Sequence, residues 1–390
     1  MNGRLETRAV HSGEERRGPY GSLTMPIVLS STYTFENTND VRNFVSRKSE
    51  GKPARYEYGR YGNPTQTAVE RKLAELDGGA KALMFSSGMS AITTSLLTIL
   101  SAGDHLIVVG EIYRRTRDLI MRHMARWGIQ ATFATVDGLA SSIQPNTRLV
   151  FFEVLTNPHL RVPNIEQIVS VARQHRLTTV ADATFATPVN LRPLGLGVDL
   201  VVHSATKYLG GHNDLLAGAV IGSSEALEKM EAARGVFGGI ASPIDAYLVL
   251  RGVKTLPLRV QQQNESALLL AEFLDGHEAV SHVYYPGLSS HPDHDIASRL
   301  MSGFGGVVSF EMAGGLEAAA HCIDHLNIPY IGPTLGGVES MVQQQALFIS
   351  SDAKERAKSG IPDSLIRYAV GIELVDDLIE DLRQAMAMRY

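Results

Sequence analysis

Lys207 is the residue whose type and position most favour covalent chemistry in this chain of 390 residues. An apolar run at 199–202 predicts a buried strand, and the hydroxyl residues Ser204 and Thr206 lie between that strand and the lysine. Ligands of open α/β sheets bind beyond the carboxyl ends of the strands. A lysine there can become a nucleophile, and neighbouring hydroxyls suit a phosphate, so the segment favours a Schiff base with pyridoxal phosphate. The alternative is a lysine that ends a strand in solvent.

Two further features would complete a site for that cofactor. Asp182 closes an apolar strand, which predicts a carboxylate at the same edge of the sheet as Lys207. An aspartate that keeps the pyridine nitrogen protonated makes pyridoxal phosphate an electron sink. Ser86, Gly88 and Met89 belong to a turn between a strand and a helix, where free backbone N–H groups attract a phosphate. Each feature is common alone, and a single acid could also be a helix cap or a surface charge, but the pair of Asp182 and Lys207 is more specific.

The elements that must position these residues alternate between strands and helices. Apolar runs predict strands at 82–85, 105–109, 131–135, 149–153, 178–182 and 199–202. Helical patterns are present at 68–76, 89–100, 114–127, 164–175 and 224–234. This alternation predicts an α/β fold with a mostly parallel sheet and helices on both faces. Glu153 and Asn157 would also lie near the carboxyl ends of its strands.

The chain is long enough for two or three domains. Residues 1–57 are polar with short apolar pieces, which predicts an extended arm. Residues 58–250 hold the alternating pattern of the large domain. From 251 onward a long helical stretch is broken near Pro257, and strands at 307–312 and 367–372 alternate with helices at 317–326 and 376–388. This C-terminal part predicts a smaller α+β domain.

Composition excludes several classes of protein. The charged fraction of 20% and hydrophobic fraction of 44% are ordinary for a soluble globular protein, and a net charge of −5 offers no basic face for nucleic acid. Because we find no signal core and no apolar run that could span a bilayer, we expect a cytoplasmic protein without membrane contact.

Cys322 is expected to be a buried structural thiol. His291, Asp293, His294 and Asp295 resemble metal ligands, but a polar loop with a proline is the favoured interpretation, so no metal is expected.

A series of motifs resembles, in its order, the Cys/Met-metabolism family of pyridoxal-phosphate enzymes, which have fold type I. The motifs are YGRYGNPT (58–65), SSGM (86–89), EIYRRT (111–116), TNP (156–158), DATFATP (182–188), HSATKYLGGHND (203–214), LGGVES (335–340) and IRYAVGIE (366–373). The resemblance covers nearly the whole chain. Within that family, the strings LRVQQQN (258–264), VSHVYYPGL (280–288) and GFGGVVSFE (303–311) resemble the plant-type cystathionine γ-synthases.

The resemblance implies a role for each matching residue. Three would be catalytic: Lys207 would carry the cofactor, Asp182 would pair with its pyridine nitrogen, and Tyr113 would stack on its ring. The phosphate would be held by Gly88, Met89, Ser204 and Thr206, and by Tyr58 and Arg60 of a neighbouring subunit. The substrate would be bound by Arg367, Asn157, Arg114, Arg115, Glu153 and Thr334, with Arg367 and Asn157 on its carboxylate. The family also implies a seven-stranded sheet in the large domain and a homotetramer made of two dimers.

The chain departs from the family pattern at three places. Ala183 follows Asp182 where many relatives have Asn, and Gln344 and Gln345 stand where relatives often have His-Pro. Many lyases have Gly-Gly or Gly-Cys directly after the stacking tyrosine, whereas this chain has Arg114 and Arg115. The plant-type synthases are also basic at that position.

The resemblance implies a γ-replacement in transsulfuration, in which an activated homoserine ester loses its γ-substituent and L-cysteine adds to give cystathionine. Lys207 would move the Cα and Cβ protons, and Tyr113 would assist proton transfer near the leaving group. The main alternative is a γ- or β-lyase, similar to cystathionine or methionine γ-lyase, that releases ammonia and a 2-keto acid. A regulator that binds pyridoxal phosphate without turnover is disfavoured, because binding alone does not need Lys207, Asp182, Tyr113 and Arg367 together.

Overall fold

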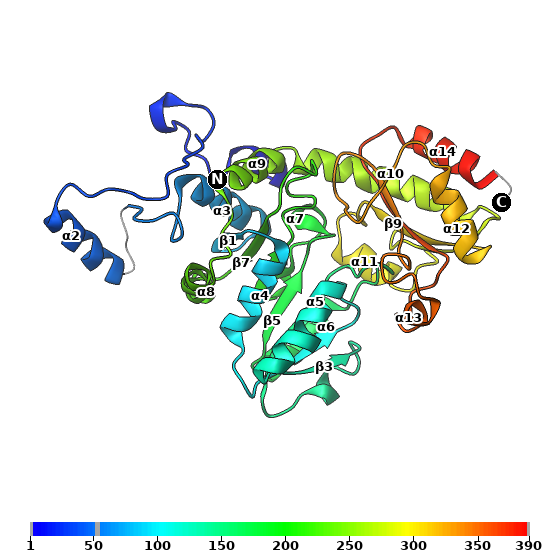
Figure 1. The fold of residues 1–390 in the computed structure, drawn as a ribbon, viewed down its shortest axis with the longest axis horizontal. Helices are drawn as coiled ribbons and strands as arrows, with labels where there is room; N and C mark the ends of the chain where they lie inside the picture. Colours follow the sequence, from blue (N-terminus) through cyan, green and yellow to red (C-terminus); the bar gives the residue numbers. More distant parts are fainter. Residues whose placement is uncertain (1–2, 51–54, 388–390) are drawn as a thin grey trace.

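The structure of the chain is a computed structural model that describes residues 3–50 and 55–387. It contains two sheets in different halves of the molecule, one of seven strands and one of five (Figure 1). No helix within these described ranges is long and apolar enough to cross a membrane. The same residues contain no group of three or more His, Cys, Asp or Glu side chains placed to hold a metal ion.

The seven-stranded sheet has the order β1-β7-β6-β5-β4-β2-β3. Its strands are β1 (Lys81–Phe85), β2 (His105–Val109), β3 (Gln130–Ala134), β4 (Thr147–Glu153), β5 (Thr178–Asp182), β6 (Leu200–His203) and β7 (Gly218–Gly222). β7 is antiparallel to both of its neighbours, and the other paired strands are parallel. The mostly parallel seven-stranded sheet is therefore confirmed. The strand patterns missed β7, a five-residue strand with a glycine at each end.

Helices cover both faces of this sheet, as the alternating pattern predicts. They are α3 (Pro64–Asp77), α4 (Gly88–Ile99), α6 (Ile165–Gln174) and α8 (Ser224–Phe237). Successive residues of β1 point to opposite faces, so that Leu83 joins the core under α4 and α8 while Met84 joins the core under α3 and α6. Both side chains are fully buried.

The ends of α3 follow from its sequence. The side chain of Asn63 caps the helix by accepting a hydrogen bond from the N–H of Thr65 at 2.8 Å, and Pro64 occupies the first turn. The helix ends at Gly78, whose φ of 79° lies in the left-handed region that favours glycine. As a result Asp77 is the last helical residue, and it is buried against the sheet.

The single helix expected at 114–127 is interrupted. The chain forms α5 (Arg114–Asp118), then a π-helical turn at Leu119–Met124 and a 3-10 turn at Ala125–Trp127. The change of hydrogen-bonding pattern keeps Ile120 and Met124 buried against the sheet.

The five-stranded sheet has the order β10-β11-β12-β9-β8 and confirms a second, smaller sheet. Its strands are β8 (Val280–Tyr284), β9 (Val307–Met312), β10 (Tyr330–Ile331), β11 (Met341–Gln344) and β12 (Leu365–Ala369). The other helices of the C-terminal part of the chain are α11 (His294–Leu300), α12 (Gly315–Asp324), α13 (Ala353–Ala357) and α14 (Val375–Ala387). Of these, α11 packs on the core of the large sheet through Ala297. Cys322 of α12 is buried and has a free thiol.

Two helices connect the halves, and their break lies near Pro257 as expected. α9 (Pro243–Val253) ends before Lys254, and α10 (Leu256–Asp275) has Pro257 in its first turn. α10 belongs to both halves: Val260 is part of the core of the large sheet, whereas Leu270 is part of the core of the small one.

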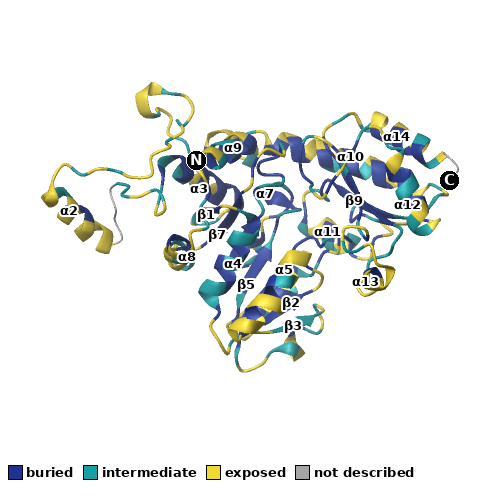
Figure 2. Ribbon diagram, viewed as in Figure 1, coloured by how far each residue is buried: buried dark blue, intermediate teal, exposed yellow. Residues whose placement is uncertain are grey.

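The N-terminal arm lacks a core of its own. It contains α1 (Leu5–His11) and α2 (Thr38–Ser49), and α2 projects away from the body of the molecule (Figure 1). Only Ala9, Ser12 and Phe44 are buried within residues 3–50. Large apolar side chains of the arm are exposed, including Leu23 at 90%. Much of the arm is coloured as exposed in Figure 2. An arm with this exposure is suited to packing on another chain.

Candidate active site

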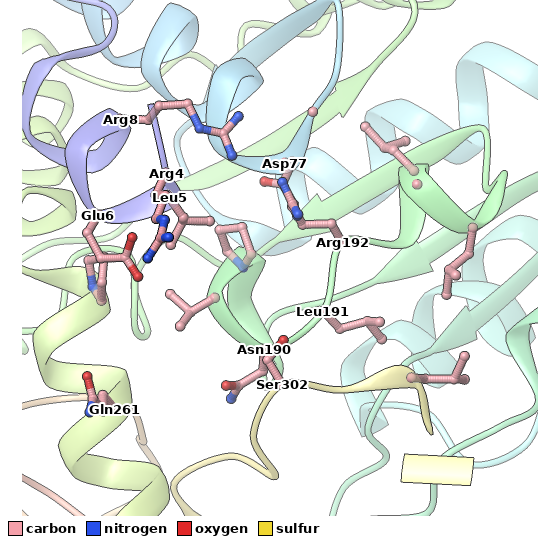
Figure 3. Close-up of a pocket in the computed structure, with 18 of the residues that line it drawn as sticks. Arg4, Leu5, Glu6, Arg8, Asp77, Asn190, Leu191, Arg192, Gln261 and Ser302 are labelled. Atoms are coloured by element: carbon pink, nitrogen blue, oxygen red, sulfur yellow. The ribbon is translucent and has the colours of Figure 1, made fainter. Parts of the chain in front are cut away.

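A cavity of about 230 Å³ lies at the carboxyl ends of β4, β5 and β6. The predicted site residues that line it are Gly88, Met89, Tyr113, Glu153, Asn157, Asp182, Ser204, Thr206, Lys207 and Arg367. Apolar side chains such as Leu155 and Leu335 complete its wall. The fold therefore brings together residues from both sheets around one space. A larger cavity of about 920 Å³ lies between α1 and α10 (Figure 3), but none of the predicted site residues lines it.

Lys207 lies in a turn four residues beyond the end of β6, with its ammonium group buried in the cavity. Its Nζ donates a hydrogen bond to Oγ1 of Thr334 at 3.0 Å. Burial, together with the positive charge of Arg367, lowers the pKa of Lys207 to about 8. A much larger fraction of this amine is therefore neutral at pH 7 than of an ordinary lysine, and the neutral form is the nucleophile.

Asp182 and Glu153 are partners in the register of β5 and β4, so two carboxyl groups lie side by side at the cavity. Burial and the neighbouring charge of Asp182 raise the pKa of Glu153 well above its usual value. Burial also raises the pKa of Asp182, but Oδ1 of Asp182 accepts hydrogen bonds from the backbone N–H and the hydroxyl of Thr184, which oppose the shift. Of the two carboxyl groups, Glu153 therefore holds a proton more readily than Asp182.

The start of α4 forms a place for a phosphate. Ser87 caps the helix by accepting a hydrogen bond from the N–H of Ser90, and this leaves the N–H groups of the first turn directed at the cavity wall. Gly88 has to be glycine because a Cβ there would lie 2.8 Å from Cβ of Ser204. Thr206 lines the cavity and exchanges hydrogen bonds with the backbone of Ala217.

Arg367 of β12 is buried and presents a cation to the same cavity. Its terminal nitrogens donate to Oδ1 of Asn157 (3.3 Å), the carbonyl of Thr334 (3.3 Å) and Oε1 of Gln343 (3.1 Å). Nε has no hydrogen-bond partner among the described residues. Burial lowers the pKa of Arg367 to about 10, so it is still a cation at neutral pH. A buried guanidinium with an unused N–H suits a substrate carboxylate.

Tyr113 lies immediately before α5, with its ring 44% exposed. Its backbone N–H donates to Oε1 of Glu153 at 2.5 Å. Tyr113 lines the cavity, where its ring could cover a planar ligand.

Six predicted site residues do not line the cavity of the single chain: Tyr58, Arg60, Ser86, Arg114, Arg115 and Thr334. Thr334 nevertheless accepts the hydrogen bond of Lys207. Arg114 and Arg115 are exposed on α5, where Arg115 forms a 3.5 Å ion pair with Asp118. Arg60 donates to the carbonyl of Gly235, and its guanidinium lies over the ring of Tyr58. Ser86 also lies outside the lining, and its neighbour Ser87 takes its place.

Several residues of the site were missed by sequence reasoning. Thr184 holds Asp182 through two hydrogen bonds, and a Thr two residues after an Asp is a signal for such a turn. Gln343 holds Arg367 across the pairing of β11 with β12, which only the register of the strands reveals. Gln344 donates to the carbonyls of Leu316 and Asp363 and does not line the cavity.

The residues of this cavity fit pyridoxal 5′-phosphate. Lys207 supplies a nucleophilic amine, Asp182 a carboxyl group whose Oδ2 is left for the pyridine nitrogen, and the start of α4 an anion site. The close approach of Gly88 to Ser204 keeps this part of the cavity free of side-chain bulk.

Comparisons with known proteins agree with this fit. The family described as Cys/Met metabolism PLP-dependent enzyme matches residues 6–387. The chloroplastic cystathionine gamma-synthase 1 of Arabidopsis thaliana is 44% identical over 97% of this chain and 68% of its own length. The L-methionine gamma-lyase of Fusobacterium nucleatum subsp. polymorphum is 38% identical over 98% of both chains. The crystal structure of metB from Corynebacterium glutamicum superposes with a TM-score of 0.91 at 35% identity, over 99% of this chain and 98% of that one. The chain is therefore an enzyme that uses pyridoxal 5′-phosphate, has fold type I, and belongs to the Cys/Met metabolism family.

Proposed function

We propose that this enzyme catalyses γ-replacement on an activated homoserine ester, adding L-cysteine to form cystathionine. The observation that carries the proposal is the meeting of Lys207, Asp182 and Arg367 in one cavity, in a chain with 44% identity to a plant cystathionine γ-synthase. A lyase relative has 38% identity, which makes the synthase reaction the better supported one.

Bound pyridoxal phosphate supplies an electron sink for negative charge that develops on the substrate. Arg367 and Asn157 hold the substrate carboxylate and so fix the orientation of its Cα–H bond. Lys207 takes the proton from Cα and then from Cβ, because its lowered pKa lets it act as a base near neutral pH. Tyr113 lies at the cavity wall and assists proton transfer near the γ-substituent.

A γ- or β-lyase is the second candidate, and the methionine gamma-lyase relative favours it over a regulator without turnover. The two reactions share the residues that move protons and differ in the group that attacks after the leaving group departs. Water ends the lyase reaction with ammonia and a 2-keto acid, whereas a bound thiol ends the synthase reaction with cystathionine.

Product analysis on O-phospho-, O-succinyl- and O-acetylhomoserine, each with and without cysteine, tests the proposal. We expect cystathionine to be the main product of at least one ester when cysteine is present. If the 2-keto acid and ammonia are the main products at saturating cysteine, the enzyme is a lyase. A cofactor-loaded protein that converts no ester and no sulfur amino acid contradicts both.

The leaving group is proposed to be an anion, phosphate or succinate, that binds to α5. Cations in the first turn of a helix interact unfavourably with the helix dipole. Arg114, Arg115 and Arg117 of α5 are therefore expected to interact with negatively charged groups. Arg115 forms an ion pair with Asp118, and the guanidinium of Arg117 lies over the ring of Phe133. Arg114 has no ion pair with any described residue, which makes it the better candidate for the substrate anion.

Replacing Arg114 with Gly should therefore lower kcat/KM for the phosphoryl or succinyl ester by about 10- to 100-fold, because a charge-assisted hydrogen bond contributes about 1.5–3 kcal/mol. The neutral acetyl ester should be nearly unaffected. Arg115→Gly is the matched control, since its exposed pair with Asp118 is worth at most about 1 kcal/mol. Equal losses on all three esters would contradict the assignment.

The assembly is proposed to be a homotetramer of two dimers, in which the arm (1–57) and the motif with Tyr58 and Arg60 serve the neighbouring site. The proposal is supported by the exposed apolar side chains of the arm and by the absence of Tyr58 and Arg60 from the lining of their own cavity. We also propose that 58–250 forms the cofactor domain and 251–390 the C-terminal domain.

The plant relative is described as chloroplastic, so the cytoplasmic location stays a prediction.

Mixing two inactive variants tests the shared site. Arg60→Ala should weaken cofactor retention, and reassembly with Lys207→Ala subunits should restore part of the activity, because some sites then carry neither change. The regained activity of dissociated and reassembled mixtures is the measurement. Arg47→Ala, which removes an exposed arginine of α2, is the control and should retain cofactor normally. No recovery in any mixture would place Tyr58 and Arg60 in the site of their own subunit.

A further inference from the structure

A buried pair of ionisable residues lies directly behind the active site, and the mechanism above does not use it. Nε2 of His203, the last residue of β6, lies 3.2 and 3.1 Å from the two carboxylate oxygens of Asp77, the last residue of α3. Both residues are 1% exposed. A charged group with so little solvent contact requires a partner of opposite charge, so the pair cannot be an incidental surface contact.

Both ring nitrogens of His203 face hydrogen-bond acceptors. Nε2 faces the carboxylate of Asp77, and the ring also forms a hydrogen bond with the backbone of Ala183. The N–H of Ala183 already donates to the carbonyl of Val202 at 2.9 Å, so its carbonyl oxygen is the group that accepts from the ring. Two acceptors around one imidazole favour the ring with a proton on each nitrogen.

The electrostatics of the pair agree with this geometry. Burial alone would lower the pKa of His203, but the charge and hydrogen bond of Asp77, and then the charge of Asp182, raise it above its usual value. The effect is mutual, because the positive charge of His203 lowers the pKa of Asp182. Val202, the register partner of Asp182, immediately precedes His203.

We propose that Asp77 holds His203 as a buried imidazolium, and that this charge keeps Asp182 ionised for the pyridine nitrogen of the cofactor. Asp77 and His203 are then positioning residues, which act through Asp182 and touch neither substrate nor cofactor. Without the imidazolium, Asp182 would lie beside Glu153 in a site where burial favours the neutral acid. The inference deepens the proposed function and rests on its assignment of Asp182.

The other charged groups around the pair are few. Two acidic residues raise the pKa of His203: Asp77 of α3 and Asp182 of β5. Asp77 also lies at the wall of the larger cavity, whose remaining charged lining residues are Arg4, Glu6, Arg8 and Arg192 (Figure 3).

The first experiment measures the unaltered holoenzyme and uses a substitution at the pair only to assign the resonance. Proton-coupled nitrogen NMR of ¹⁵N-histidine-labelled protein reports directly whether each ring nitrogen carries a proton. We expect both nitrogens of His203 to stay protonated at pH 8. The resonance is assigned by its loss in His203→Gln. A neutral His203 ring at pH 8 would overturn the proposal.

The second experiment measures the consequence for the cofactor. With a ¹⁵N-labelled pyridine ring, His203→Gln and Asp77→Asn should lower the fraction of protonated pyridine nitrogen. We expect kcat to fall about 10-fold with KM within about twofold, since a loss of one pKa unit of stabilisation is a factor of ten. Asp77→Glu retains the charge and should restore both values in part.

His105→Gln is the matched control for the loss of a buried imidazole. His105 is also 1% exposed, but its ring lies between the hydroxyls of Thr147 and Thr132, and burial lowers its pKa. It should leave the pyridine nitrogen protonated and kcat unchanged. If His203→Gln lowers only thermal stability, and leaves kcat and the protonation of the pyridine nitrogen unchanged, the pair is structural and the proposal fails. Failure of the proposed function is distinct, because it would show in the products of the unaltered enzyme, in which cystathionine would then not be the main product.

Discussion

Lys207→Ala is expected to abolish turnover and the visible absorption of the lysine-bound cofactor while the fold stays intact. The substitution removes the nucleophile that binds the cofactor and the base that moves the substrate protons, and loss of a base alone costs about 10²- to 10⁴-fold in rate. Absorbance after cofactor loading and kcat on the preferred ester are the measurements. Unchanged circular dichroism would show that the loss is chemical.

A second buried lysine provides the control for this assignment. Burial also lowers the pKa of Lys72 to about 8, but its Nζ donates to the carbonyls of Ala9 and Val10 and lies 3.2 Å from Glu14, outside the cavity. Borohydride reduction should therefore fix the cofactor on Lys207 and leave Lys72 unmodified. If the reduced cofactor is found on Lys72, a lowered pKa, and not a position in the cavity, determines which lysine binds the cofactor.

Arg367→Leu should have the next largest effect, a decrease in kcat/KM of about 10²- to 10³-fold. The change removes a cation that offers two N–H groups to a carboxylate, and each charge-assisted hydrogen bond contributes about 1.5–3 kcal/mol. It also leaves Asn157 and Gln343 without their partner. Arg367→Lys should recover part of the rate, because it restores the charge without the fork of donors.

An ester analogue that lacks the α-carboxylate separates binding from folding in this test. The unaltered enzyme and Arg367→Leu should convert the analogue at similar low rates, because the guanidinium has no group to bind. If the substitution reduces both rates by the same factor, Arg367 supports the fold of the cavity and does not bind the substrate carboxylate.

Local patterns located Lys207 and Asp182 because each follows a strand that apolar residues mark clearly. Arg367 and Asn157 were assigned only through the resemblance, since they lie 210 residues apart and meet through the packing of the two sheets. Thr184 was missed because its role depends on the conformation of a single turn. The partnership of His203 with Asp77 was missed for a similar reason, since it needs the spatial position of α3 relative to β6. Residue type alone cannot supply such tertiary information.

For four residues, the resemblance to the family predicts a position at the ligand that the single chain does not show. Arg114 and Arg115 were expected at the substrate, yet the cavity lining contains neither. Tyr58 and Arg60 directly follow the arm in the sequence, and neither lines the cavity of its own subunit. For these four residues the missing information is the position of a substrate or of another subunit, which one sequence does not contain.

The helix α10 gives the active site a mechanical property. Its 20 residues span about 30 Å, and its two ends belong to different cores, so it acts as a stiff rod between the halves. The hydrogen bonds of Lys207 with Thr334 and of Arg367 with Asn157 cross the same boundary. A small tilt of this rod would change the distance between the group that binds the cofactor and the group that binds the carboxylate. Substrate capture and product release can thus be coupled to a rotation of a few degrees, without unfolding of either half.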